Sequence, residues 1–271
     1  NVVTNFDPYN PDPGLLSSSQ PEQRYKMDKD IEHPYMDQYV LAFEHDLGND
    51  FAVKAELIYR RNKNFIESVS IDGDFDKVVG VGEDGELVPL YNQNNLDDTL
   101  LITNPDGLKR EYSAFILTAT KRLSRRWQML VAYARSHATG NIDNLDFSTS
   151  AVLGSNYGPS PFLDTPNSLF NGQGTLTNDF KNEVTLQGQY IIPRIEVTLS
   201  ADYRYVSGST WATQGRATEY LIDPNGSTTD PLNRAQFNQG RVRYFIEPRG
   251  SQRLDEINNL NLRAEKFFTF E

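Results

Sequence analysis

The chain has 271 residues, a formal net charge of −11 and no cysteine. The negative charge argues against a nucleic-acid partner, because binding to phosphates needs a basic surface, and without cysteine there is no disulfide framework, thiolate metal site or thiol nucleophile. The mean hydropathy is −0.58, and no stretch approaches the ~20 apolar residues of a membrane helix, so any membrane contact would come from strands or from a surface helix.

The first predicted element after a polar N-terminal loop is a hairpin. Residues 1–32 are rich in Pro, Asp, Asn, Ser and Gln and are predicted to be that loop. In the following "MDQYVLAFEHDLGNDFAVKAELIYRR", apolar and polar residues alternate on both sides of the short turn "LGND". A period of two indicates strands rather than a helix, although Val40 and Ile58 fall on the polar side.

A second hairpin follows a second polar stretch. Residues 63–109 are predicted to be a long loop, in which "DGDFDKVVGVGEDGELVPLY" indicates a small extra hairpin. The next segment, "EYSAFILTATKRLSRRWQMLVAYARS", alternates on both sides of the turn "LSRR". Residues 137–178 are again polar and rich in Gly, Asn and Pro, and are predicted to be a loop.

The third hairpin, "NEVTLQGQYIIPRIEVTLSADYRYVSGS", has the clearest pattern. Its polar positions include Glu183, Thr185, Asp202 and Arg204. Its apolar or small positions are Val184, Leu186, Gly188, Tyr190, Ile195, Val197, Leu199, Ala201, Tyr203 and Tyr205. Residues 207–238 are predicted to be a further loop, "RVRYFIEPRG" a short strand, and "NNLNLRAEKFFTF" a last alternating strand.

These elements repeat in one order: strand, short turn, strand, long loop. The short turns are expected at 47–50, 123–126 and 192–194. Short turns at one end and long loops at the other are typical of outer-membrane barrels, so the predicted fold class is all-β, an antiparallel transmembrane β-barrel segment of about seven or eight strands with short periplasmic turns and long extracellular loops. A soluble β-sandwich is the alternative, since its strands also alternate.

Aromatic residues favour the membrane barrel. Phe51, Trp127 and Tyr190 lie next to short turns, and Tyr59, Tyr133, Tyr203 and Tyr205 lie near the long-loop ends. The eight residues from Phe51 to Tyr59 span ~26 Å at ~3.3 Å per residue, which matches an apolar band of ~25 Å between two aromatic girdles. The apolar positions of the third hairpin are therefore expected to contact lipid and the polar ones to face the lumen. Leu199→Arg is then expected to hinder insertion by ~2–4 kcal/mol if Leu199 lies near the midplane, and Thr198→Arg far less.

No constellation of an enzyme stands out. The three histidines, His33, His45 and His137, are widely scattered. "GVGEDG" at 80–85 imitates part of a phosphate loop, but no helix is predicted after it. Asp97 and Asp98 are expected in a solvated loop.

Two acidic pieces could bind calcium, which takes oxygen ligands. These are "SIDGDFD" at 70–76 and "DPNGSTTD" at 223–230, and turn chemistry explains the second without a metal. Neither has the spacing of a helix–loop–helix calcium loop. We therefore predict no catalytic, cofactor-binding or metal site, and no enzyme.

Three segments resemble Oar-like TonB-dependent transporters. They are "IEHPYMDQYVLAFEHDL" at 31–47, "YSAFILTATKRLSRRWQMLVAYARSHATGNI" at 112–142 and "YFIEPRGSQRLDEINNLNLRAEKFF" at 244–268, in family order. The resemblance implies a barrel of about twenty-two strands around an N-terminal plug. It implies that residues 1–271 are part of one such barrel domain, in its C-terminal half, with the plug domain and the final strands absent.

The resemblance also implies the function and the place of action. A protein of this family lies in the bacterial outer membrane and binds a scarce extracellular ligand, and an energising complex acts through the plug to move the ligand inward. The expected partners are outer-membrane lipid, the plug, the TonB energising complex and an unknown ligand, with no cofactor. The alternative is a small structural or adhesive barrel, because eight strands can close.

Overall fold

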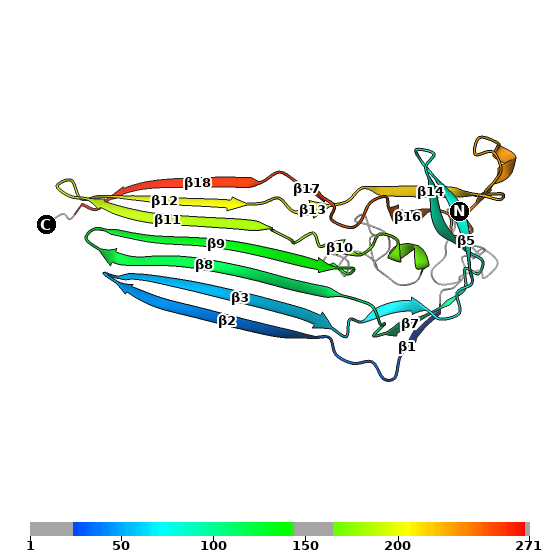
Figure 1. The fold of residues 1–271 in the computed structure, drawn as a ribbon, viewed down its shortest axis with the longest axis horizontal. Helices are drawn as coiled ribbons and strands as arrows, with labels where there is room; N and C mark the ends of the chain where they lie inside the picture. The colour runs from blue at the N-terminus through cyan, green and yellow to red at the C-terminus, as the bar shows by residue number, and fades with distance from the viewer. Residues whose placement is uncertain (1–23, 144–164, 269–271) are drawn as a thin grey trace, which may run out of the picture.

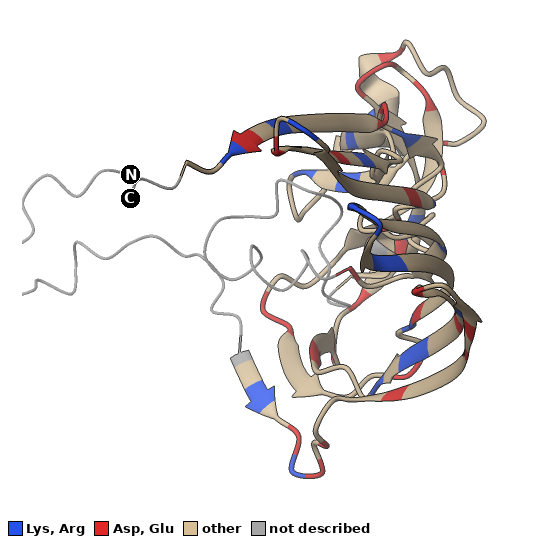
Figure 2. Ribbon diagram, turned by 90° about the vertical axis from the view of Figure 1, so that its left-hand side faces the viewer, with Lys and Arg blue, Asp and Glu red and all other residues tan. Residues whose placement is uncertain are grey.

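The computed structural model describes residues 24–143 and 165–268, and its main feature is a long antiparallel sheet. Seven long strands form it in the order β18-β12-β11-β9-β8-β3-β2 (Figure 1). A short eighth strand, β10 (Gly174–Thr175), extends it by pairing with β9. The long strands are β2 (Tyr35–Gly48), β3 (Phe51–Lys63), β8 (Arg110–Ser124), β9 (Trp127–Gly140), β11 (Asn182–Ile192), β12 (Val197–Val206) and β18 (Ile257–Lys266). Viewed along the strands, the sheet curves into an arc (Figure 2).

The register places the alternating residues of all seven strands on two continuous faces. Leu186, for example, lies opposite Val131 on one side and Tyr203 on the other, while Gln187 lies opposite Asp202. Because side chains alternate across a strand, one such pairing fixes the faces of the residues between the register shifts that occur near the short turns. We call the two surfaces the apolar face and the polar face. The apolar face holds Tyr39, Leu41, Phe43, Val53, Ala55, Leu57, Tyr59, Phe115, Leu117, Ala119, Trp127, Met129, Val131, Tyr133, Val184, Leu186, Gly188, Tyr190, Val197, Leu199, Ala201, Tyr203, Tyr205, Leu260, Leu262 and Ala264.

Three tight turns join neighbouring strands at one end of the sheet. Asn49 and Asp50 have positive φ values of 54° and 66°, and so do Arg125 and Arg126 at 48° and 73°. Positive φ at both central residues defines the type I′ turn, whose twist matches that of the flanking strands. The third turn has four residues, 193–196, so Ile195 lies in the turn and not, as predicted, in the strand.

The long connections at the opposite end fold into small sheets, which we call the cap (Figure 1). One sheet has five strands and another three, in which β1 pairs with β7 in the parallel sense. The cap consists of β1 (Arg24–Met27), β4 (Glu67–Ser70), β5 (Phe75–Gly82), β6 (Leu87–Gln93), β7 (Thr99–Thr103), β13 (Thr210–Trp211), β14 (Gln214–Leu221), β15 (Arg234–Gln236), β16 (Val242–Phe245), β17 (Gln252–Arg253) and the 3₁₀ turns η3 (Pro166–Leu169) and η4 (Pro231–Asn233).

The cap corrects the prediction of long unstructured connections. The extra hairpin predicted within 63–109 is confirmed as β5 and β6, and the short strand at 241–250 is confirmed as β16. The prediction was wrong for β4 and β7, and for β14, which lies in the supposed loop 207–238. These strands are short, and β14 pairs with β5 and β16 rather than with one hairpin neighbour alone, so local alternation does not reveal them.

The only hydrophobic cluster of buried residues found in the described part of the chain lies in the cap. It is formed by Val88, Leu90, Ala217, Phe237, Val242 and Tyr244. The apolar face of the long sheet, by contrast, is open: Leu57 on the interior strand β3 is 53% exposed and Leu186 on β11 is 39% exposed. A soluble sandwich would cover this face with a second sheet, so the fold contradicts that alternative.

Candidate functional site

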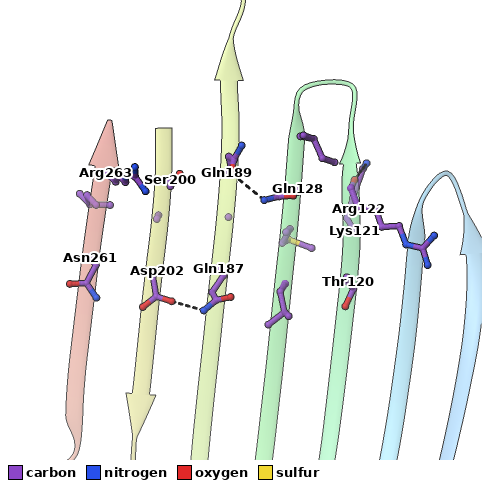
Figure 3. A pocket seen from close by; sticks show the side chains of 16 residues that line it. Thr120, Lys121, Arg122, Gln128, Gln187, Gln189, Ser200, Asp202, Asn261 and Arg263 are labelled. Atoms are coloured by element: carbon purple, nitrogen blue, oxygen red, sulfur yellow. Dashed lines mark hydrogen bonds between the residues drawn. The ribbon is translucent and has the colours of Figure 1, made fainter. Parts of the chain in front are cut away.

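The polar face is hollowed near the short turns, across β8, β9, β11, β12 and β18 (Figure 3). Two side-chain hydrogen bonds join neighbouring strands there. The amide of Gln128 donates to the Gln189 side chain at 3.1 Å, and the amide of Gln187 donates to the Asp202 carboxylate at 2.8 Å. The open hollow has a volume of about 630 Å³, and its lining also includes Thr120, Arg122, Ser200, Asn261 and Arg263.

Two ion pairs on this face join neighbouring residues of opposite charge. Arg204 donates to the Glu183 carboxylate through Nε at 2.8 Å and lies within 2.6 Å of it through Nη2. Lys54 pairs with Glu56 at 2.9 Å on the next-but-one position of the same strand. All four groups remain partly exposed. The face therefore offers a lining of donors and acceptors that suits water or a polar protein surface.

The apolar face presents an aromatic border at each end. Trp127 and Tyr190 lie opposite each other beside the short turns. At the cap end Tyr39 and Tyr59 lie opposite each other on β2 and β3, with ring centroids 6.4 Å apart. Rings with a polar tip prefer the boundary between lipid and water. The open face between these borders suits hydrocarbon, because exposed apolar surface of this extent is unfavourable in water.

A buried carboxylate joins the cap to the long sheet. Asp179 is 1% exposed, and it accepts a hydrogen bond from the backbone N–H of Ala138, at the cap end of β9, at 2.7 Å. Arg253 in β17 donates to its other oxygen at 2.5 Å, and also to the backbone carbonyl of Gly208 at 2.6 Å. Because a buried charge is stable only when it is paired, this contact fixes three segments that are distant in sequence.

The core of the cap includes a second polar contact, in which one of the two side chains is buried. The hydroxyl of Tyr244, a side chain with no exposed surface, donates to the Glu86 carboxylate at 2.5 Å. Burial is the main cause that raises the pKa of Tyr244, and the hydrogen bond from Tyr244 is the main cause that lowers the pKa of Glu86. Nearby, four hydrogen bonds, led by the backbone N–H of Thr213, lower the pKa of Glu247 to about 2.

The acidic segments noted in the sequence are used in turns and strand contacts. Asp72 accepts hydrogen bonds from the backbone N–H and the hydroxyl of Thr99, and these lower its pKa. Asp223 and Asp230 accept from backbone N–H groups two residues further on, which is turn chemistry as predicted. No group of three or more acidic, histidine or cysteine side chains within residues 24–143 and 165–268 could hold a metal ion.

The structure corrects one prediction about the carboxylates and places the histidines apart. Asp97 is exposed as expected, but Asp98 is 2% exposed and thus does not lie in a solvated loop. His45 lies on the apolar face and stacks on Phe43, whereas His137 lies at the cap end, 3.3 Å from Asp179. His33 is exposed before β2 begins. The segment 80–85 is the end of β5 and the turn into β6, with no helix after it.

Sequence comparison identifies the family to which this chain belongs. A family model described as an outer membrane beta barrel domain matches residues 2–211, which is most of the chain. The chain therefore belongs to this family and lies in the outer membrane. The predicted fold class, all-β with antiparallel strands of a membrane barrel, is confirmed for the long sheet.

Structural comparison finds a distant likeness to the outer membrane transporter YddB from Escherichia coli. The TM-score is 0.46 with 8% sequence identity, and the match covers 90% of this chain and 28% of YddB. This chain thus spans well under half of that transporter. A search of the curated proteins found no match. Within the described residues, no helix is both long enough and apolar enough to cross a membrane, a finding that has no bearing on spans made by strands.

Proposed function

We propose that this protein is a TonB-dependent outer-membrane transporter of the Oar-like kind, and that this chain forms part of its barrel wall and its outer loops. The observation that carries the proposal is the cap. The long connections at one end of the wall pack around a core of their own, whose centre includes Leu90 and Tyr244. Loops held in a defined shape above a polar-lined wall are suited to bind a ligand before it passes inward.

The two free edges of the sheet support a barrel larger than these seven strands. β2 and β18 each have one neighbour within the described chain, and they do not pair with each other. Lipid does not tolerate unpaired backbone groups, which supports a wall completed by further strands. The family resemblance supplies them: about twenty-two strands enclosing a plug, with this chain in the C-terminal half.

The expected partners follow from the two faces. Outer-membrane lipid would cover the apolar face, and the plug would contact the polar face, where Gln187, Asp202 and Arg204 offer donors and acceptors. The energising complex would act through the plug. In this arrangement the polar face would keep the lumen hydrated and orient the plug, and we assign no catalytic role or cofactor to it.

The test is ligand accumulation in cells. A strain lacking the gene and a strain lacking the energising complex are each compared with the parent for accumulation of labelled iron chelates, cobalamin, oligosaccharides and peptides. The proposal predicts that at least one class is lost equally in both strains. Normal accumulation of every class in the gene-deletion strain would contradict it, as would uptake that persists without the energising complex.

A small structural or adhesive barrel is the second candidate, since a barrel of eight strands can close. It predicts normal accumulation in both strains, together with a weakened envelope or reduced attachment of cells to surfaces. The open edges at β2 and β18 favour the larger barrel.

A further inference from the structure

Five cationic side chains gather at two neighbouring short turns. Lys121 and Arg122 lie near the end of β8, Arg125 and Arg126 form the β8–β9 turn, and Arg194 lies in the β11–β12 turn. The turns are adjacent, because the backbone N–H of Ile191 donates to the carbonyl of Arg126 at 2.8 Å. We call these five residues the basic turn cluster. Glu196 is the one acidic residue of the two turns, although the chain as a whole carries a net charge of −11.

Four of the five charges have no protein partner among the described residues. Arg122, Arg125, Arg126 and Arg194 are exposed, and their guanidinium groups take part in none of the ion pairs or hydrogen bonds of that part of the chain. By contrast, Arg204 and Arg253 are each paired with a carboxylate. The cluster is therefore available to a ligand that carries negative charge.

The backbone of the cluster is unfavourable for arginine. Arg125 and Arg126 have φ values of 48° and 73°, and Arg194 has a φ value of 79°. Type I′ turns prefer Asn-Gly because a β-carbon is disfavoured at positive φ. The equivalent β2–β3 turn uses Asn49 and Asp50 at the same two positions. A side chain that the turn geometry disfavours points to a role outside the fold.

The position of the cluster indicates what binds there. Trp127 and Tyr190, the aromatic border of the apolar face, lie directly beside it. Lys121 lies on the same face, with its ammonium 4.7 Å from the centre of the Trp127 ring, and it donates to the Arg122 carbonyl at 3.1 Å and to the Ser124 hydroxyl at 2.6 Å. Lys121 is only 6% exposed, so its ammonium holds the turn against the aromatic border and is not itself free for a ligand. Arg122 lines the hollow of the polar face, whereas the exposed Arg125, Arg126 and Arg194 lie at the turns, beside the aromatic border where lipid headgroups would begin.

We propose that Arg125, Arg126 and Arg194 of the basic turn cluster bind the phosphate of an anionic phospholipid in the leaflet at the short-turn end. One guanidinium group can bind two phosphate oxygens at once, and basic residues near a membrane surface attract anionic lipid. Trp127 and Tyr190 would flank the upper acyl chains of the same lipid. The proposal uses the outer-membrane location and does not depend on transport.

The experiment measures which lipid the intact protein retains. The purified protein in mild detergent is mixed with equal amounts of phosphatidylglycerol and phosphatidylethanolamine, and bound lipids are counted by native mass spectrometry. The decisive variant is Arg125→Asn with Arg126→Gly, which replaces the unfavourable turn with the preferred one. We expect its midpoint of unfolding in urea to rise while the preference for phosphatidylglycerol falls at least fivefold, roughly the effect of one cation near a membrane surface.

The matched control removes two exposed arginines from the cap. Arg216→Gln with Arg241→Gln changes the net charge by the same amount and is expected to leave the lipid preference unchanged. Equal retention of the two lipids by the unaltered protein, or an unchanged preference in the turn variant, would overturn the proposal. The turn variant could instead keep the lipid preference and lose cross-links to an acidic periplasmic protein. That result would assign the cluster to a protein partner and would also overturn the proposal.

Discussion

At the scale of single residues, the parity of a position along a strand determines its environment. Leu186 and Gln187 are neighbours in β11, yet Leu186 lies opposite Val131 on the apolar face and Gln187 lies opposite Asp202 on the polar face. The alternation was predictable because it depends on the strand alone. The expected cost of Leu199→Arg assumed a position near the bilayer midplane. Leu199 in fact lies opposite Tyr190, beside the short turns, and is thus closer to the aromatic border than to the middle of the apolar face.

Leu186 is therefore the better position for a test of the apolar face. We expect Leu186→Arg to destabilise the protein folded in lipid by ~2–4 kcal/mol, the cost of a cation near the bilayer midplane on a barrel wall. Gln187→Arg is the matched control and should change it by well under half as much. The measurement is reversible urea unfolding in lipid vesicles. Equal effects of the two substitutions would contradict the assignment of the faces.

Burial of single carboxylates was not predictable from the sequence. Asp179 and Asp98 look like ordinary loop residues, but both are buried. Asp179 owes its burial to Ala138 and Arg253, which lie about 40 residues before it and about 70 residues after it. A local sequence pattern cannot predict contacts between residues so far apart, so the contact that joins the cap to the long sheet is seen only in the structure.

Asp179 provides the second prediction. Asp179→Asn should destabilise the attachment of the cap by about 2–4 kcal/mol, because it leaves the partly buried guanidinium of Arg253 without its charge partner. Amide hydrogen exchange should report the change as faster exchange around Ala138 and Arg253. Asp97→Asn, at an exposed position, is the control. Exchange that is unchanged at both sites would show that the ion pair does not hold the cap.

At the scale of elements, the long strands were predictable and the cap was only partly so. β11 and β12 alternate over their whole length and are joined by a short turn, so their pairing is local. β14 pairs with β5 from a distant part of the sequence, and its bulge between Ala217 and Glu219 interrupts the alternation. The β5–β6 hairpin was found because Gly and Asp mark the turn between its strands.

The core of the cap provides a prediction about pH. The pKa of Glu86 is lowered from its ordinary value of 4.5, chiefly by the hydrogen bond from Tyr244. A carboxyl group with a lowered pKa stabilises the fold above its unfolded value, and this contribution is lost as the pH falls through the folded value. Protection of the β14 and β16 amides should therefore weaken as the pH is lowered from 4.5.

Substitution of the tyrosine isolates that contribution. Tyr244→Phe should lower the stability of the cap at neutral pH by roughly 1–3 kcal/mol, the cost of removing the donor to a charged acceptor, and should flatten the loss of protection below pH 4.5. Tyr220→Phe is the control, because the Tyr220 ring packs on Phe237 in the same core. An undiminished pH response in Tyr244→Phe would mean that another group causes it.

At the scale of the whole molecule, the arrangement is inverted relative to a soluble protein. The buried core lies in the cap, and the largest sheet leaves its apolar face open, with residues such as Leu57 and Leu199 exposed. An outer-membrane barrel explains both observations, because lipid completes the apolar side and water fills the polar side. The polar surface near the short turns is then part of the interior (Figure 3).

The most direct test of this account is thiol labelling of single-cysteine variants in intact outer membranes. The sequence has no cysteine, so the introduced thiol is the only one that this chain contributes to the labelling signal. A membrane barrel predicts that Gln187→Cys and Ser200→Cys react with a small water-soluble maleimide, whereas Leu186→Cys and Leu199→Cys react only with a lipid-soluble one. Equal reactivity of the two faces toward the water-soluble reagent would contradict it.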